Sequence, residues 1–479
     1  MALIIEQQPK YNLLPVGQEI IYTVHDNTAI SGNFKIKYIA EIYVNNVSSN
    51  LMVTANRVAV LKASPNAQGR GIFDLQSILQ SYVSPDYEGG VVHNSTTSFF
   101  SQYNGTNYSD TTPHTIHQID DFSTNRNSVR YVRVRFKIEF ATSATGTVST
   151  ALGSVDGNKI LVFNGVLYET DILKMDTNGK FGYHLGHQGL IMNASGDKFL
   201  TNSPTTQYIR LNDYMTLPFF SQYNDDFRVG VSGLTSPSIK FIKIQFYYNG
   251  ATTGSLITKT ISPSTGGHSG YMSDSNNKLQ FAGVGTGNLV GSGVSLPANW
   301  DYYTVVAHDS GDNLVSDTYK IYKQEDDCKG FETIRLTWLN KYGVWDYYNF
   351  TKKSTRTYNI NRKQYKQVSG TWNENIYRTK DHKGGTKNFS GSISEQIAIN
   401  TDYITEAEAQ WLEELFISTD VFILNKRSTD STDEGYIRKY IEPVTITNTS
   451  HTRKTTANDR LIQYNFTLQK TRTKKTHRI

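Results

Sequence analysis

The chain has 479 residues and a formal net charge of +5, with 19% charged and 12% aromatic side chains. This length is enough for about three domains with buried cores, and the aromatic content excludes an intrinsically disordered chain. The single cysteine, Cys328, excludes an internal disulfide and with it a secreted disulfide scaffold.

The N-terminal segment predicts strands. Residues 19–26 and 34–46 read as two strands, and in the second apolar and charged side chains alternate, as a half-buried strand requires. Between them, residues 27–33 predict a turn. Residues 56–65 predict a further strand.

A short helix and a long polar segment follow. Asp74 is placed to cap a helix whose apolar side chains include Leu75 and Leu79, and which ends before Pro85. Residues 93–115 are polar without periodicity and predict a long loop or a domain junction.

The central segment continues the β pattern. Residues 130–140 alternate strictly between polar and apolar side chains and predict a strong strand, as do residues 238–250. Residues 159–169 predict a hairpin about the turn formed by Asn164 and Gly165.

The end of this segment alternates between loop and strand signals. The Gly- and Ser-rich residues 261–293 predict a loop, and residues 301–309 and 316–324 predict a hairpin.

The C-terminal segment combines strands with one helix. Residues 332–350 predict a hairpin that turns at residues 341–343, and the basic run 351–367 follows it. The other predicted strands lie before and after the helix, at residues 391–400, 420–425, 436–448 and 460–470.

The helix is predicted over residues 405–416. Thr405 and Glu408 form a T-x-x-E capping box, in which each side chain satisfies a backbone N–H group at the helix start. One face carries Ala407, Trp411, Leu412, Leu415 and Phe416, and the other carries Glu406, Gln410, Glu413 and Glu414. We therefore expect Trp411 and Leu415 to be buried against the sheet formed by the flanking strands.

These patterns predict a mainly β chain of antiparallel, β-sandwich-like modules that ends in an α+β module of one sheet and one helix. The predicted domains are a β-sandwich-like domain at residues 1–125, a β-rich domain with long loops at residues 126–325, and a basic assembly module at residues 326–479.

Local motifs for chemistry are absent from the sequence. The glycines that begin at Gly283 do not match a dinucleotide-binding fingerprint, and no helical crossover surrounds them. His184 and His187 lack a second pair of metal ligands nearby, and the acidic neighbours of Cys328 would raise the pKa of its thiol. We expect no enzyme activity, cofactor or metal, and no secretion signal or membrane insertion, so that the chain folds in a reducing cytoplasm.

Positive charge gathers toward the C-terminus. From Cys328 onward there are 25 lysines and arginines against 16 acidic residues, a net charge of about +9, whereas the preceding part carries about −4. The densest cluster comprises Lys470, Arg472, Lys474, Lys475 and Arg478. It is interpreted as a solvated tail, as an arm that docks on an acidic neighbour, or as a phosphate-directed surface that faces DNA in a channel. We expect this cluster to repel itself in a monomer and to be ordered by a partner.

Several stretches carry a family resemblance. Residues 69–83, 198–220 and 331–350, together with the closing segments between residues 403 and 470, resemble virion structural proteins of tailed bacteriophages, particularly those of Bacteroidota hosts. The resemblance implies a subunit of a six- or twelve-fold ring or an adaptor in the tail, collar or head-to-tail region, in contact with other virion proteins. The closing module also looks like tail-tube and baseplate modules, in which a sheet and one helix assemble into a ring.

The resulting expectation is a structural virion protein whose chemistry is association. Trp411, Leu415, Phe416 and the basic cluster are the candidate interaction residues. One alternative is a receptor- or carbohydrate-binding virion protein, with Trp300, Asp301, Tyr302 and Tyr303 as an aromatic platform. A glycan-cleaving enzyme is the less favoured alternative, because its carboxylates would have to come from distant segments.

Overall fold

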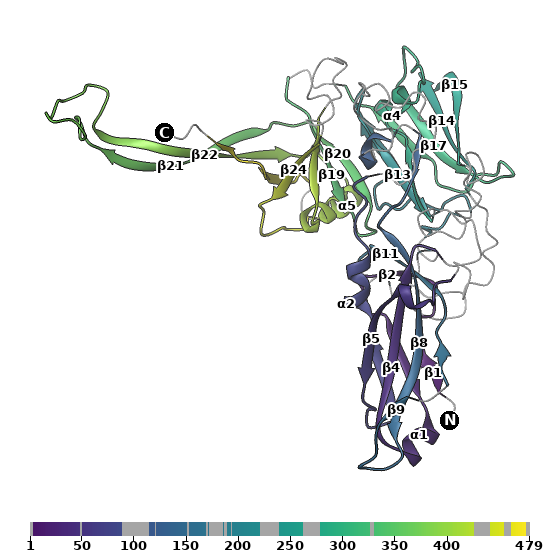
Figure 1. Cartoon of the computed structure of the whole chain (residues 1–479). Coiled ribbons are helices and arrows are strands. Elements are labelled where there is room, and N and C mark those ends of the chain that lie inside the picture. The colour runs from purple at the N-terminus through teal and green to yellow at the C-terminus, as the bar shows by residue number, and fades with distance from the viewer. Residues whose placement is uncertain are drawn as a thin grey trace, which may run out of the picture. The chain divides into compact units, whose positions relative to one another are not determined.

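The chain is mainly β and divides into two compact units (Figure 1). Unit 1 comprises residues 1–324 and 339–346, and unit 2 comprises residues 325–338 and 347–479. The predicted fold class is therefore confirmed. The computed structural model describes residues 3–47, 50–88, 115–119, 121–150, 153–168, 171, 185, 189–192, 194–220, 239–261, 278–325, 330–425, 441–454 and 461–475.

The first part of unit 1 is a β-sandwich-like pair of sheets that share one hydrophobic core. The smaller sheet has the order β1 (Ile4–Gln7), β3 (Ile21–His25) and β6 (Arg70–Asp74). The larger sheet has the order β2 (Leu13–Pro15), β11 (Ile160–Phe163), β8 (Val129–Ala141), β4 (Phe34–Asn45) and β5 (Arg57–Ala63), with β9 (Ser149–Thr150) and β10 (Val155–Asp156) on β8.

The strict alternation of β8 places its side chains in this core. Val134 and Phe136 are fully buried, and the Phe136 ring lies 5.4 Å from the ring of Tyr22 on β3. The charged side chains that alternate with them lie on the other face of β8, where Lys137 Nζ lies 2.9 Å from Glu41 Oε1. Burying one such apolar side chain stabilises the fold by about 1.5–3 kcal/mol.

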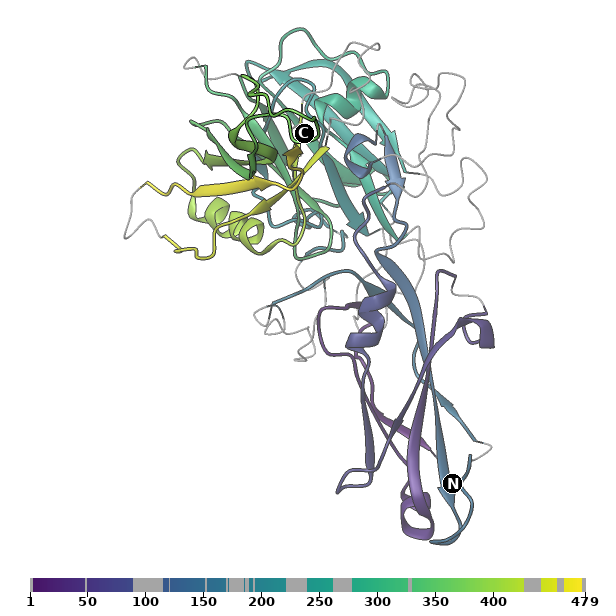
Figure 2. The same cartoon turned by 60° about the vertical axis from the view of Figure 1, so that its left-hand side comes forward.

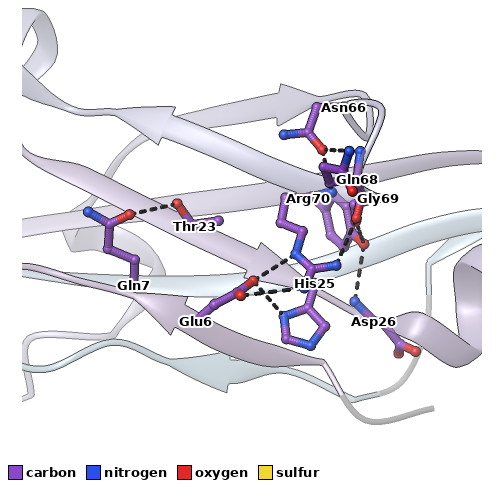
Figure 3. Close-up of polar contacts among 10 residues, drawn as sticks. Glu6, Gln7, Thr23, His25, Asp26, Asn66, Gln68, Gly69 and Arg70 are labelled. Atoms are coloured by element: carbon purple, nitrogen blue, oxygen red, sulfur yellow. Dashed lines mark hydrogen bonds and ion pairs between the residues drawn. The ribbon is translucent and has the colours of Figure 1, made fainter.

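Charged side chains hold the edge strand β1, in addition to Ile5, which packs against the core (Figure 3). Arg70 Nε on β6 donates to Glu6 Oε2 at 2.8 Å, and His25 Nδ1 on β3 lies 3.2 Å from the same oxygen. The Arg70 hydrogen bond holds the pKa of the Glu6 carboxyl below its usual range, although burial opposes this shift. The interaction joins all three strands of the smaller sheet through one carboxylate.

Several short helices connect the strands in this part of unit 1. The turn predicted at residues 27–33 is wrong, because Asp26 accepts a hydrogen bond from Ala29 N at 2.9 Å and caps the helix α1 (Asn27–Gly32). The short helix predicted after Asp74 is confirmed, and the Asp74 carboxylate accepts from Gln76 N. It consists of α2 (Gln76–Leu79) and η2 (Gln80–Tyr82), and two other single turns are η1 (Thr54–Asn56) and η4 (Ile116–Gln118).

Unit 1 contains a second pair of sheets. The five-stranded sheet has the order β12 (Thr206–Ile209), β18 (Tyr319–Lys323), β17 (Tyr302–His308), β14 (Phe241–Tyr248) and β15 (Ala251–Thr260). The three-stranded sheet has the order β13 (Thr216–Phe220), β16 (Leu279–Gly283) and β7 (Phe122–Thr124). Phe199 links the two sheets, because its ring contacts Phe219 on β13 and Tyr319 on β18.

Two expectations for the central segment are wrong. The loop predicted over residues 261–293 contains β16 and the helix α4 (Thr286–Gly291) in its described part. The hairpin predicted about Asn164 and Gly165 does not form, since β11 pairs in parallel with β2 and antiparallel with β8. After the turn, Val166 N donates to Lys341 O instead of to a returning strand.

The predicted domain boundary between residues 125 and 126 is also wrong. β7 pairs with β16 of the second sheet pair, and the next strand, β8, pairs with β4 of the first. The chain therefore passes back and forth between the two sheet pairs.

The division after residue 324 falls one residue from the predicted boundary at 325/326, although residues 339–346 belong to unit 1. Most of the loop predicted at residues 93–115 lies outside the described residues.

The described residues of unit 2 form one antiparallel sheet with one helix, α5 (Glu406–Ile417), packed against it (Figure 2). The strands have the order β20 (Trp345–Phe350), β19 (Ile334–Leu339), β23 (Val421–Leu424), β24 (Ile441–Ile446), β25 (Asn465–Lys470), β22 (Gly385–Asn400) and β21 (Thr355–Gln367), with β26 (Lys474–Lys475) on β22.

The predicted capping box starts α5. Thr405 Oγ1 accepts from Glu408 N at 3.2 Å, and Glu408 Oε2 accepts from Thr405 N at 2.8 Å. Trp411 is 4% exposed and Leu415 is fully buried, as predicted, and the Trp411 ring lies 5.1 Å from that of Trp338 on β19. Glu414 is an exception to the predicted polar face, because it is buried.

We expect Trp411→Ala to lower the free energy of unfolding of unit 2 by about 3–5 kcal/mol, since it removes a core side chain and leaves a cavity. Chemical denaturation followed by circular dichroism measures the change. Gln410→Ala is the matched control, because Gln410 is the exposed neighbour on the same helix. An unchanged denaturation midpoint for Trp411→Ala would show that this residue is not part of the core.

Candidate functional site

The most distinctive feature of unit 2 is a long two-stranded ribbon, here called the arm and defined as residues 355–400. Its strands β21 and β22 pair from Thr355 and Ala398 at the base to Gln367 and Gly385 near the tip. Figure 1 shows this ribbon running outward from the rest of its sheet. The arm contains the basic run that follows the hairpin β19–β20 in the sequence.

The inner half of the arm is supported by neighbouring strands and the outer half is not. β25 pairs with β22 over residues 396–400, and β26 pairs with Ser392 and Ile393. In the described chain, residues 385–391 pair only with β21, and β21 has no strand along its other edge. The outer arm therefore exposes both faces and one full edge.

The apolar face of the sheet continues onto the arm. Ile397 is fully buried in the core, and Arg356 opposes it on β21. Because strand side chains alternate, Tyr358 and Ile360 share the face of Arg356, and they are 50% and 48% exposed. Ile393, opposite Ile360, is half-buried. This apolar strip extends beyond the part of the sheet that α5 covers.

Glu395 marks the point at which the core ends and the arm begins. Its carboxylate is buried, and Arg356 Nη1 donates to it at 2.6 Å. Lys470 Nζ and Lys474 Nζ lie 3.5 Å and 3.9 Å from its Oε2 atom. Burial by itself raises the pKa of Glu395, but the Arg356 hydrogen bond and the two lysine charges outweigh it and hold the pKa below its usual range.

Two of the predicted basic residues, Lys470 and Lys474, lie beside this carboxylate. Lys470 also contacts Glu442 at 2.9 Å, and Lys474 Nζ lies 5.6 Å from the centre of the Tyr358 ring. The cluster was expected to repel itself in a monomer, but Lys470 and Lys474 lie near carboxylates of the same chain, which offset that repulsion. Arg472 and Lys475 are exposed, and Arg478 lies outside the described residues.

The predicted interaction residues form two separate groups. Trp411 and Leu415 belong to the core of unit 2, and Phe416 is partly buried, with its ring stacked 4.3 Å from that of Phe466. These three side chains pack inside the module, whereas Arg472, Lys474 and Lys475 lie on the surface next to the arm. The structure thus leaves the basic group, and not Trp411, Leu415 or Phe416, available to a partner.

The tip of the arm, residues 368–384, is internally hydrogen-bonded. Thr371 Oγ1 donates to Ile376 O and accepts from Arg378 N, both at 2.9 Å. Tyr377 lies against Gly370, where a Cβ atom would come within 2.4 Å of its ring. Trp372 is 82% exposed on this ordered loop. The tip presents an aromatic side chain on a preorganised support.

A second surface with distinctive chemistry lies in unit 1. Four tyrosines on neighbouring strands oppose one another directly, in the order Tyr208, Tyr322, Tyr302 and Tyr247. We call this the tyrosine row. The rings of Tyr247 and Tyr302 stack at 4.9 Å with an interplanar angle of 8°, and Tyr208 at the end of the row is 51% exposed.

The predicted aromatic platform is largely core. Trp300 is 4% exposed and Tyr303 is fully buried, and both rings contact Phe246. Only Tyr302 of the aromatic residues in that group reaches the surface, as a member of the tyrosine row. The sequence missed the row because its members come from segments far apart in the chain.

The glycines near Gly283 have a packing role. A Cβ atom at Gly283 would lie 2.0 Å from Ile119 O, and one at Gly285 would lie 2.4 Å from Met215 N. Such contacts leave no room for a side chain, so tight backbone packing explains both residues.

The described residues hold no group of three His, Cys, Asp or Glu side chains that could bind a metal. His184, His187 and Cys328 lie outside that part of the chain. No helix in the described ranges is long and apolar enough to span a membrane.

Comparisons with known proteins identify no family. No family model and no curated protein matches the chain. Among solved structures, the fibronectin(III)-like modules of Clostridium thermocellum CbhA are 8% identical, with 67% of this chain and 94% of that chain covered and a TM-score of 0.13.

Two bacterial macroglobulins give similar values. Escherichia coli alpha-2-macroglobulin is 9% identical, with 83% of this chain and 21% of that chain covered and a TM-score of 0.17. Salmonella alpha-2-macroglobulin reacted with methylamine is 7% identical, with 97% and 23% covered and a TM-score of 0.18. This chain thus spans less than a quarter of either macroglobulin, and these low scores carry no argument about its fold or function.

We expect Glu395→Gln to destabilise unit 2 by roughly 1–3 kcal/mol at pH 7, because it replaces the buried carboxylate that accepts from Arg356 and lies beside Lys470 with a neutral amide. Since the folded pKa lies below that of the unfolded chain, the contribution of Glu395 is fully present above the unfolded pKa of about 4.3 and is lost as the pH falls through the folded value.

The difference in unfolding midpoint between wild type and Glu395→Gln should therefore shrink as the pH is lowered from 7 to 3. Denaturant titrations at a series of pH values measure it. Glu374→Gln, at the exposed tip, is the control and should show no such trend. A difference that stays constant with pH would mean that the ionised carboxylate does not stabilise the base of the arm.

Proposed function

We propose that this protein is a structural component of a tailed-bacteriophage virion, built as an oligomeric ring or adaptor in the tail, collar or head-to-tail region. It assembles through contacts with copies of itself and with other virion proteins. The observation that carries the proposal is the arm, with its exposed outer half, its free edge and its apolar strip. The family resemblance of residues 331–350 and of the closing segments supports the placement in a virion.

The physical argument starts from the stability of the arm. A two-stranded ribbon is marginally stable in water unless a third strand or another layer supports it. The outer arm has neither in the described chain. A free strand edge with unpaired N–H and C=O groups also favours pairing with another chain. A neighbouring subunit that covers the arm supplies what the ribbon lacks.

The apolar strip gives this contact a driving force. Tyr358 and Ile360 are about half exposed, so covering the remainder contributes about half of the roughly 1.5–3 kcal/mol that full burial of an exposed apolar side chain gives. In a closed ring every subunit both gives and receives one arm, so the same contact recurs around a six- or twelve-fold ring. Exposed Trp372 at the tip adds an aromatic side chain of the type that anchors interfaces.

The assembly role predicts that Tyr358→Ser combined with Ile360→Ser weakens self-association by about tenfold or more, because the two side chains lose their buried area. Sedimentation velocity over a range of protein concentrations measures it. The matched control is Thr357→Ala combined with Asn359→Ala, which alters the opposite face of the same strand.

Two outcomes would contradict this proposal. One is a wild-type protein that stays monomeric at every concentration, alone and with the other virion proteins of its phage. The other is a Tyr358 and Ile360 double variant that folds and assembles as well as the wild type. Circular dichroism of both variants separates loss of assembly from loss of folding.

The tyrosine row favours a second candidate function, a receptor- or carbohydrate-binding virion protein. Tyrosine offers rigid apolar surface together with a hydroxyl group, the mixture that adaptable binding surfaces use. The adjacent row of Thr206, Lys320, Thr304 and Gln245 adds hydrogen-bonding groups on the same face.

This second function predicts that Tyr208→Ala combined with Tyr322→Ala abolishes binding to host cells or to isolated host surface glycans. Binding of fluorescently labelled protein measures the loss. Tyr248→Ala is the control, because Tyr248 is exposed on β14 but lies outside the row. If the wild-type protein binds no host surface component, the tyrosine row has a role within the virion instead.

A further inference from the structure

The arm concentrates positive charge. Between residues 358 and 394 the chain has seven lysines and arginines and two acidic residues. β26 brings Lys474 and Lys475 alongside β22, and Arg472 lies between β25 and β26. The arm and this neighbour therefore carry a net charge of about +8, which exceeds the +5 of the whole chain.

Three cations of the outer arm have no acidic partner among the described residues. Arg362, Lys363 and Lys366 are exposed on β21, and no described carboxylate lies within ion-pair distance of them. They differ in this respect from Arg356 at the base, which contacts both Glu332 and Glu395. The three residues are thus cations without a structural partner in the described chain.

The charges occupy both faces of the ribbon. Strand alternation places Arg362 and Lys366 on one face of β21 and Lys363 on the other. The paired strand adds Lys387 opposite Tyr365, on the Lys363 face, and β26 adds Lys474 and Lys475 on opposite faces. A flat acidic protein surface could neutralise one of these faces only.

We propose that the outer arm binds double-stranded DNA, by lying as a β-ribbon in a groove with its two basic faces toward the two phosphate backbones. The major groove is about 12 Å wide and admits a two-stranded ribbon. Phosphates border both of its sides, which matches a ribbon with cations on both faces. This inference goes beyond the proposed assembly role and does not depend on it.

The chemistry of the arm fits phosphate-directed binding rather than sequence reading. Lysine and arginine contacts to phosphates give affinity that falls steeply with salt, with a slope of about −0.9 per neutralised phosphate in a logarithmic plot. Asn359, Asn361 and Gln364 lie between the cations and supply hydrogen bonds to the backbone or to base edges. We therefore expect non-specific binding of any duplex.

The experiment uses the full chain and a fluorescently labelled DNA duplex without a defined target sequence, and measures fluorescence anisotropy over a series of salt concentrations. The test variant is Arg362→Glu combined with Lys363→Glu and Lys366→Glu. We expect it to weaken binding by about tenfold or more at low salt and to reduce the magnitude of the salt slope by about three. The matched control reverses three exposed lysines of unit 1, Lys35→Glu, Lys37→Glu and Lys198→Glu, and should retain the wild-type slope.

Competition experiments separate DNA from other anionic partners. We expect duplex DNA to compete better than single-stranded DNA of equal length or polyglutamate at the same charge concentration. Equal competition by polyglutamate would overturn the proposal in favour of an acidic protein partner, and equal competition by the single strand would overturn binding in a groove. Unchanged affinity and slope in the arm variant, or a wild-type protein that does not bind duplex DNA at low salt, would also overturn it.

Sedimentation velocity of the arm variant keeps this test distinct from that of assembly. A variant that assembles normally but loses DNA binding supports the inference. A variant that loses both is compared with the Tyr358 and Ile360 double variant, which removes the apolar strip and keeps Arg362, Lys363 and Lys366. If this double variant fails to assemble but still binds DNA with the wild-type salt slope, the two functions of the arm are separate. If it loses DNA binding as well, the cations are not sufficient and the inference is wrong.

Discussion

The carboxylate of Glu395 is the point on which the organisation of unit 2 depends. It lies on β22 and receives positive charge from β21, β25 and β26 through Arg356, Lys470 and Lys474. On one side of it the sheet has a buried core under α5, and on the other side the same sheet continues as an exposed ribbon. A buried carboxylate without these partners would be strongly unfavourable, so the basic residues of the closing segment are required where the core ends.

The positively charged side chains of unit 2 therefore fall into two groups with different roles. Lys470 and Arg356 stabilise unit 2 itself, because each forms an ion pair with a carboxylate of the same unit. Arg362, Lys363 and Lys366 form no ion pair with a described carboxylate and are available for a partner. A count of charge along the sequence cannot separate these two kinds of cation, since both occur in equally basic stretches.

The sequence predicted the elements whose signals are local. The strict alternation of residues 130–140 and the capping box of Thr405 and Glu408 each depend on neighbours within a few residues, and both appear as β8 and α5. The turn at Asn164 and Gly165 gave an equally clear hairpin signal and failed, because β11 is completed by β2 and β8 from distant parts of the chain. The sequence also did not predict β21, the first strand of the arm, because the signal for it is weak. This strand is polar on both faces beyond Ile360, so it lacks the alternation that identifies a half-buried strand.

The turn between β19 and β20 has a consequence for how the chain folds during synthesis. Trp345 Nε1 donates to Asp86 O at 2.9 Å, and Tyr342 Oη donates to Asn202 Oδ1 at 2.8 Å, so residues 339–346 complete the interior of unit 1. Gly343 packs so closely on Asn164 that no Cβ atom fits between them. A ribosome that has released only the first 324 residues has therefore released an incomplete unit. The N-terminal unit must wait for about twenty further residues before it can close, and a fragment that ends at residue 324 would keep a gap where Trp345 belongs.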